Sequence, residues 1–263
     1  MAPLSPSAAV LVLHGGYENG TEPPPPGLLN LPGTRMRPFV RALRRATRAP
    51  EGSSQEGGPE GGAGVLVRQV RYAHRGWNGS RADALHDALA ALDALGEEAG
   101  GAGGSGEAGG VPVVLLGHSM GARAALLAAG HPLVRGVVGL APWCPPGDPV
   151  TQLAGRDVVL VHSSRDRITS PQATQSLTTR ARRAGARTCM VTVRGGDHAM
   201  IRRAPAWHRL TTTLVTGLLG TGSLPEPVTA ALGLPPTAEP TEGTLDLDRL
   251  RPRRGPAGLQ PSP

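Results

Sequence analysis

The sequence predicts an α/β fold in which a parallel β-sheet is covered by helices on both faces. Six short apolar runs, rich in Val and Leu, indicate strands. They span residues 8–13, 65–71, 111–116, 134–141, 157–162 and 187–194. Most of these runs lack the alternation of a half-exposed strand, as is typical of strands buried on both faces. Helical patterns separate most of them, so the strands are expected to run parallel, joined by right-handed crossovers.

Apolar stripes at helical spacing predict the connecting helices. One stripe follows Gly33, and another follows Ser80, which is the expected N-cap. Further helices are expected over 122–129, 171–184 and about 199–218. Strand and helix therefore alternate through most of the chain.

The 263 residues suffice for one domain followed by a tail. Residues 1–219 are expected to form the domain, with flexible insertions at about 50–64 and 96–110, where Gly, Glu and Ser dominate. Residues 220–263 are rich in Pro and Thr, and we expect a mostly disordered tail. A docking segment that binds through its arginines is the alternative for the tail.

Composition argues against several classes of function. The formal net charge is +7, and the chain contains arginine but no lysine. The arginines are dispersed along the chain. With one Phe and two Tyr available for base stacking, no nucleic-acid partner is expected. The spacing of His and Cys indicates no metal, and no cofactor is expected.

The N-terminal apolar run is only six residues long and has no basic segment before it, which predicts neither a signal peptide nor a membrane span. We therefore expect a cytoplasmic protein without a membrane partner. Cys144 and Cys189 are expected to be reduced structural thiols. The sequence does not predict the oligomeric state.

One apolar run ends in Gly-His-Ser-Met-Gly at residues 117–121 and continues into a helical pattern. A G-x-S-x-G pattern arises easily by chance in a chain with 38 glycines, so its context decides its meaning. Here it lies between a predicted strand and a predicted helix, which places Ser119 at the tip of a sharp turn. Gly117 and Gly121 allow strand and helix to approach closely. Ser119 is therefore the candidate nucleophile.

A serine hydroxyl needs a general base, and the base needs an orienting group. His198 lies between the last predicted strand and the last predicted helix. Asp166 follows the fifth strand, at the same edge of the sheet, and is the candidate acid. Asp197 is the weaker alternative, since adjacent side chains rarely point at each other. Histidines 118, 162 and 208 fit the role of base less well.

An oxyanion hole is expected at His14-Gly15-Gly16, directly after the first strand. A backbone N–H of Gly16 or Tyr17, together with that of Met120, would bind the developing negative charge. Taken alone, the glycine pair is equally consistent with an ordinary turn.

The order of Ser119, Asp166 and His198, with the glycine pair upstream, resembles the α/β-hydrolase superfamily, and the resemblance covers roughly residues 8–218. More narrowly, the chain is similar to small carboxylesterase and dienelactone-hydrolase-like proteins without a lid. Dienelactone hydrolases proper have a cysteine where this chain has Ser119. In this superfamily the oxyanion motif follows the third of eight strands. In this chain the glycine pair follows the first strand. The resemblance therefore implies a three-layer sheet of about six strands without the opening antiparallel hairpin and without a cap domain.

The resemblance implies a serine hydrolase acting on small esters through an acyl-enzyme, with thioesters as a further possibility. Alternatives are acyl transfer by the same residues and a non-catalytic scaffold that binds a ligand or protein. Trp77 and Trp143 follow strands at the same edge of the sheet and are candidate substrate-binding residues, although ordinary packing fits them equally well.

Overall fold

The computed structural model describes residues 6–48, 64–100 and 110–250 of the chain. Its sheet has seven strands in the order β2-β1-β3-β4-β5-β6-β7, and all neighbouring pairs are parallel. The strands are β1 (Ala8–Leu13), β2 (Val65–Gln69), β3 (Val113–His118), β4 (Val134–Leu140), β5 (Asp157–Ser163), β6 (Arg187–Val193) and β7 (Thr244–Asp246). The six predicted strands are confirmed, and β7 is a seventh that the sequence analysis missed.

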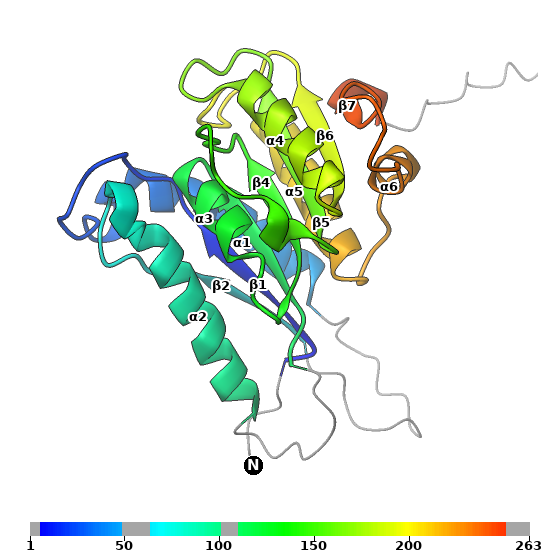
Figure 1. Cartoon of the computed structure of the whole chain (residues 1–263). Helices are drawn as coiled ribbons and strands as arrows, with labels where there is room; N and C mark the ends of the chain where they lie inside the picture. The colour runs from blue at the N-terminus through cyan, green and yellow to red at the C-terminus, as the bar shows by residue number, and fades with distance from the viewer. Residues whose placement is uncertain (1–5, 49–63, 101–109, 251–263) are drawn as a thin grey trace, which may run out of the picture.

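Helices cover both faces of this sheet (Figure 1). The helices are α1 (Leu31–Ala46), α2 (Asp83–Gly100), α3 (Met120–Ala128), α4 (Pro171–Arg183), α5 (Ala204–Leu218) and α6 (Glu226–Leu232). Helices α2, α3 and α4 bury their apolar residues in one core, and α1, α5 and α6 bury theirs in the other. Alternate residues of the strands enter the two cores, which explains why the strands read as unbroken apolar runs.

Two helix starts show how local sequence sets the element bounds. Asn30 caps α1, because its side-chain oxygen accepts a hydrogen bond from the backbone N–H of Gly33 at 3.1 Å. Ser80 does not cap α2 as predicted. It lies in a 3₁₀ turn (Gly79–Arg81), and Ala82 with φ of 47° separates that turn from the helix. Helix α2 therefore begins only at Asp83.

The C-terminal segment is folded up to residue 250, which corrects the expected disorder of 220–263 over that part. Val228, Ala231 and Leu232 of α6 and the following Leu247 are buried in the core beside β6. Strand β7 extends the sheet, and Met190 donates a hydrogen bond from its backbone N–H to the carbonyl of Gly243. Neither element shows a clear sequence pattern, because the helix has seven residues and the strand only three.

The expected insertion at 96–110 is wrong over its first five residues, since α2 continues to Gly100. Residues 101–109 of this insertion, 50–63 of the other and 251–263 of the tail lie outside the described residues. The connection from β4 to β5 holds one 3₁₀ turn, Thr151–Leu153. Among the described helices, none is long and apolar enough to cross a membrane.

Candidate active site

Ser119 lies at a strained turn between β3 and α3. Its backbone has φ of 53° and ψ of −117°, a left-handed conformation that L-residues rarely adopt. A Cβ on Gly117 would lie 2.5 Å from the Cα of Ala122, and one on Gly121 would lie 2.4 Å from the carbonyl oxygen of His14. Only glycine permits these approaches, so the sequence of the turn is dictated by its geometry.

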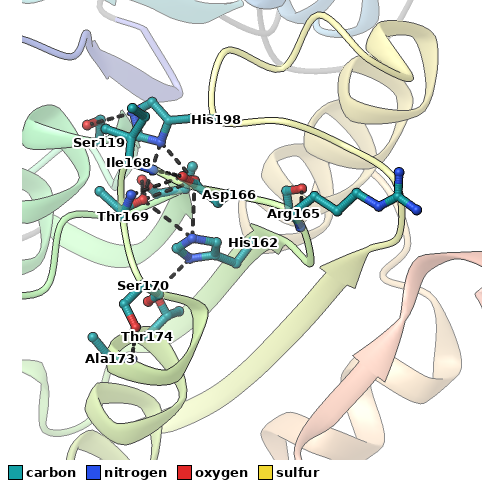
Figure 2. Close-up of polar contacts among 12 residues, drawn as sticks. Ser119, His162, Arg165, Asp166, Ile168, Thr169, Ser170, Ala173, Thr174 and His198 are labelled. Atoms are coloured by element: carbon teal, nitrogen blue, oxygen red, sulfur yellow. Dashed lines mark hydrogen bonds and ion pairs between the residues drawn. The ribbon is translucent and has the colours of Figure 1, made fainter.

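Three side chains from separate loops form a hydrogen-bonded chain (Figure 2). Ser119 Oγ lies 3.1 Å from His198 Nε2, and His198 Nδ1 lies 2.8 Å from Asp166 Oδ2. The carboxylate can only accept, so Nδ1 carries the ring proton and Nε2 is left to accept the serine proton. The structure thus brings Ser119, His198 and Asp166 together in the order that a nucleophile, a base and an acid require.

Asp166 is held by five donors. Its Oδ1 accepts hydrogen bonds from the backbone N–H groups of Ile168 and Thr169, at 2.8 and 2.9 Å. Its Oδ2 faces His198, the hydroxyl of Thr169 at 3.0 Å and His162 Nε2 at 3.2 Å. Burial alone would raise the pKa of Asp166, but the hydrogen bonds from His162, His198 and the backbone hold it well below its usual value. Asp166 is therefore a carboxylate at neutral pH.

Known proteins resemble this chain in structure. The esterase of Pyrobaculum calidifontis is 13% identical to this chain and has a TM-score of 0.55. The match covers 84% of this chain and 78% of the esterase. The monoacylglycerol lipase of Paleococcus ferrophilus is 14% identical and has a TM-score of 0.52, and the match covers 81% of this chain and 96% of the lipase. A putative hydrolase of the α/β superfamily from Xanthomonas campestris is 15% identical, with coverages of 81% and 99% and a TM-score of 0.50.

This chain has the α/β-hydrolase fold. Neither the family models nor the curated proteins contain a match to its sequence. The turn that holds the candidate nucleophile Ser119 follows β3, which lies between β1 and β4 in the sheet.

The glycine turn after β1 lies against Ser119. A Cβ on Gly15 would stand 3.4 Å from the Cβ of Ser119, and one on Gly16 would collide with the side chain of Met120. Within the described ranges, the backbone N–H groups of Gly16 and Met120 have no acceptor assigned outside regular helices and strands. Tyr17 differs, because its N–H already donates to the carbonyl of Arg75 at 3.0 Å. The expected role of Tyr17 as an oxyanion donor is therefore wrong.

The two candidate tryptophans pack around an arginine. The guanidinium of Arg123 lies 4.0 Å from the ring centre of Trp77 and 4.5 Å from that of Trp143. Asp148 pairs with the same guanidinium at 2.7 and 2.8 Å. Trp77 is only 3% exposed, so it does not line an open groove, and the expectation that it binds substrate is wrong. Trp143 is half-buried and remains a prediction.

Two residues of the site were missed as site residues by sequence reasoning. His162 is fully buried, with Nε2 towards Asp166 and Nδ1 2.8 Å from the hydroxyl of Thr174 (Figure 2). Thr169 donates its hydroxyl to Asp166 and also lies 3.2 Å from His198 Nδ1. The available signal was the position of His162 at the end of β5, four residues before Asp166.

His118 lies beneath His198. Its Nε2 is 2.9 Å from the backbone carbonyl of His198, which can only accept, so Nε2 carries the proton. Its Nδ1 is buried without a partner in the described part of the chain. Burial, followed by the charge of His198, lowers the pKa of His118 to about 3. His118 is therefore neutral at physiological pH.

We expect the free energy of unfolding to decrease as the pH falls from about 6.5 towards 3. Between these values the unfolded chain protonates His118 and the folded chain does not, so acid favours unfolding. One such group changes the stability by about 1.4 kcal/mol per pH unit. Urea unfolding at pH 6.5 and 4.5 measures this slope, and His118→Asn should reduce it. Equal slopes for the two proteins would contradict the assignment of a buried neutral histidine.

Cysteine is not a plausible nucleophile in the described chain. Cys144 and Cys189 are both buried, and burial raises the pKa of each thiol to about 12. Within residues 6–48, 64–100 and 110–250, no group of three His, Cys, Asp or Glu side chains is arranged to hold a metal ion.

Proposed function

We propose that the protein is a serine hydrolase that cleaves small esters through an acyl-enzyme. The observation that carries the proposal is the continuous chain from Ser119 Oγ to His198 and on to the buried Asp166 carboxylate. A hydroxyl becomes a useful nucleophile only with a positioned base, and a buried carboxylate keeps that base in the required tautomer. The strained backbone at Ser119 supports a functional role as well.

The reaction follows from these positions. Ser119 Oγ attacks the ester carbonyl carbon while its proton moves to His198 Nε2. The carbonyl oxygen becomes an oxyanion, which the backbone N–H groups of Met120 and Gly16 bind. The bond to the alcohol oxygen then breaks, and His198 protonates that oxygen. Water attacks the acyl-enzyme with His198 again acting as base, which releases the acid and regenerates Ser119.

We propose that the site accepts a short acyl group. A cavity of about 70 Å³ adjoins the glycine turn and is lined by residues that include Gly16, Tyr17, Leu29 and Leu31. Larger cavities of about 700 and 830 Å³ lie between α5 and α6 and alongside β2, and the second of them shares His14 and Asn30 with the small cavity. We propose that Trp143 contributes to the surface that binds the substrate.

A screen of p-nitrophenyl esters tests this function. We expect kcat/KM to be highest for chains from acetate to hexanoate and to fall for laurate, because an open groove cannot surround a long chain. Ser119→Ala should lower turnover by roughly a thousand-fold or more while circular dichroism and thermal unfolding stay unchanged. Near-full activity of Ser119→Ala would show that another group is the nucleophile, and a steady rise to laurate would reveal an enclosed acyl site.

A further inference from the structure

Six large apolar side chains are 58–74% exposed in the described chain, and all of them belong to loops that follow strands at the carboxyl edge of the sheet. We call this set the apolar rim. Four members lie between the end of β1 and the first residue of α1, one between β5 and α4, and one between β6 and α5. The members are Tyr17, Leu28, Leu29, Leu31, Ile168 and Ile201.

The apolar rim lies on both sides of Ser119. Strand β1, whose loop supplies four members, is the neighbour of β3 on one side, and β5 and β6 lie beyond β4 on the other. Ile168 follows Asp166 by two residues and lies close to Asp166 and His198 (Figure 2). Exposed apolar residues gathered around one site mark a surface that contacts something apolar.

Positive charge lies next to two members of the apolar rim. Exposed Arg167 and Arg202 are the chain neighbours of Ile168 and Ile201. In the portion of the chain that is described, neither guanidinium is assigned an ion pair. An apolar side chain beside an unpaired arginine suits a layer with an apolar interior and anionic head groups.

We propose that the apolar rim inserts into the surface of an anionic lipid layer, so that Ser119 acts on amphiphilic esters held in that layer. The proposal rests on the function proposed above. A second copy of the chain or another protein fits less well, because a partner that covered the apolar rim would also close off Ser119. A lipid layer instead delivers the ester to it. The sequence analysis expected no membrane partner because it found no membrane-spanning segment. A protein can bind a membrane surface without such a segment.

Vesicle binding tests the proposal without relying on catalysis. The probes are vesicles of phosphatidylcholine alone and of phosphatidylcholine mixed with phosphatidylserine, and the bound protein is measured by sedimentation. Wild type and Ser119→Ala should bind alike and prefer the phosphatidylserine vesicles. The double variant Leu28→Ser/Ile201→Ser should bind about tenfold or more weakly, because two apolar side chains no longer enter the layer. Its turnover of dissolved p-nitrophenyl acetate should equal that of wild type.

A matched pair of charge variants separates the apolar rim from general charge. Arg167→Gln/Arg202→Gln should lose most of the preference for phosphatidylserine, whereas Arg45→Gln/Arg48→Gln, with the same change in charge beyond the rim, should retain it. Absence of vesicle binding by wild type, or equal binding by the rim variant, would overturn the proposal. A dimer that Leu28→Ser/Ile201→Ser converts to a monomer would assign the surface to a second copy instead. Loss of hydrolysis in wild type with intact vesicle binding would count against the proposed function alone.

Discussion

Asp166→Asn is expected to lower kcat by about 10⁴-fold, by analogy with amidation of the aspartate in the Ser-His-Asp triad of a serine protease. Two backbone N–H donors determine the orientation of the new side-chain amide in this variant. Because Ile168 and Thr169 both donate to Oδ1, the amide oxygen must stay there, and the NH₂ group must take the place of Oδ2. That NH₂ faces His198 Nδ1, so the ring proton moves to Nε2 and His198 no longer accepts the proton of Ser119.

Single-turnover kinetics on p-nitrophenyl acetate measures this loss, and thermal unfolding checks that the fold survives. Asp197→Asn is the matched control. Asp197 caps the turn after His198, with Oδ1 accepting from the backbone N–H of Ile201 at 2.9 Å, and no hydrogen bond joins it to the His198 ring. We expect its effect to stay below about tenfold, which is the cost of a weakened cap. A larger loss from Asp197→Asn than from Asp166→Asn would reverse the assignment of the acid.

Removal of residues 220–263 is expected to destabilise the protein strongly, which reverses what the sequence alone suggested. The deletion takes away the buried side chains of Val228, Leu232 and Leu247 and uncovers the apolar residues of β6 beneath them. Fully burying one side chain of this size contributes about 1.5–3 kcal/mol, so exposing two of the β6 side chains to water already costs at least about 3 kcal/mol. For a domain of this size the corresponding fall in Tm is on the order of 10 °C.

Thermal unfolding of two truncations measures this effect. Removal of 251–263 alone should leave Tm unchanged, as expected for a tail without an apolar face to bury. Two ion pairs, Arg194 with Asp246 and Arg203 with Asp248, also join the C-terminal segment to the loop that carries His198. One partner of each pair is well exposed, so solvent screens the attraction and the pairs contribute little to stability. Equal Tm values for the two truncations would show that α6 and β7 are not part of the core.

The central part of the fold could be predicted because burial leaves a direct record in the sequence. Strands such as β3 and β5 are covered on both faces, so each contains an unbroken run of four apolar residues, VVLL in β3 and VVLV in β5. The turn at Ser119 was equally readable, since its geometry excludes any side chain at Gly117 and Gly121. Sheet order then brings the loops after β3, β5 and β6 to one edge, which places His198 and Asp166 within reach of Ser119.

Other features depend on contacts that leave no local pattern. Strand β7 is recognisable only through its pairing with β6, and α6 is too short to show a period. The Tyr17 N–H donates a hydrogen bond to the Arg75 carbonyl, and Trp77 is buried beneath Arg123. Both contacts join segments that are far apart in the chain. His162 could be seen at the end of its strand, but its contact with Asp166 depends on the turn between them.

Covalent labelling tests the central claim most directly. A fluorophosphonate probe reacts only with a serine that a neighbouring base activates, and intact mass followed by peptide mapping locates the adduct. We predict one adduct per chain, on Ser119, with labelling abolished in Ser119→Ala and slowed by orders of magnitude in His198→Ala. An adduct on a different residue, or a wild-type protein that hydrolyses esters and takes up no label at Ser119, would contradict the assignment of Ser119 as the nucleophile.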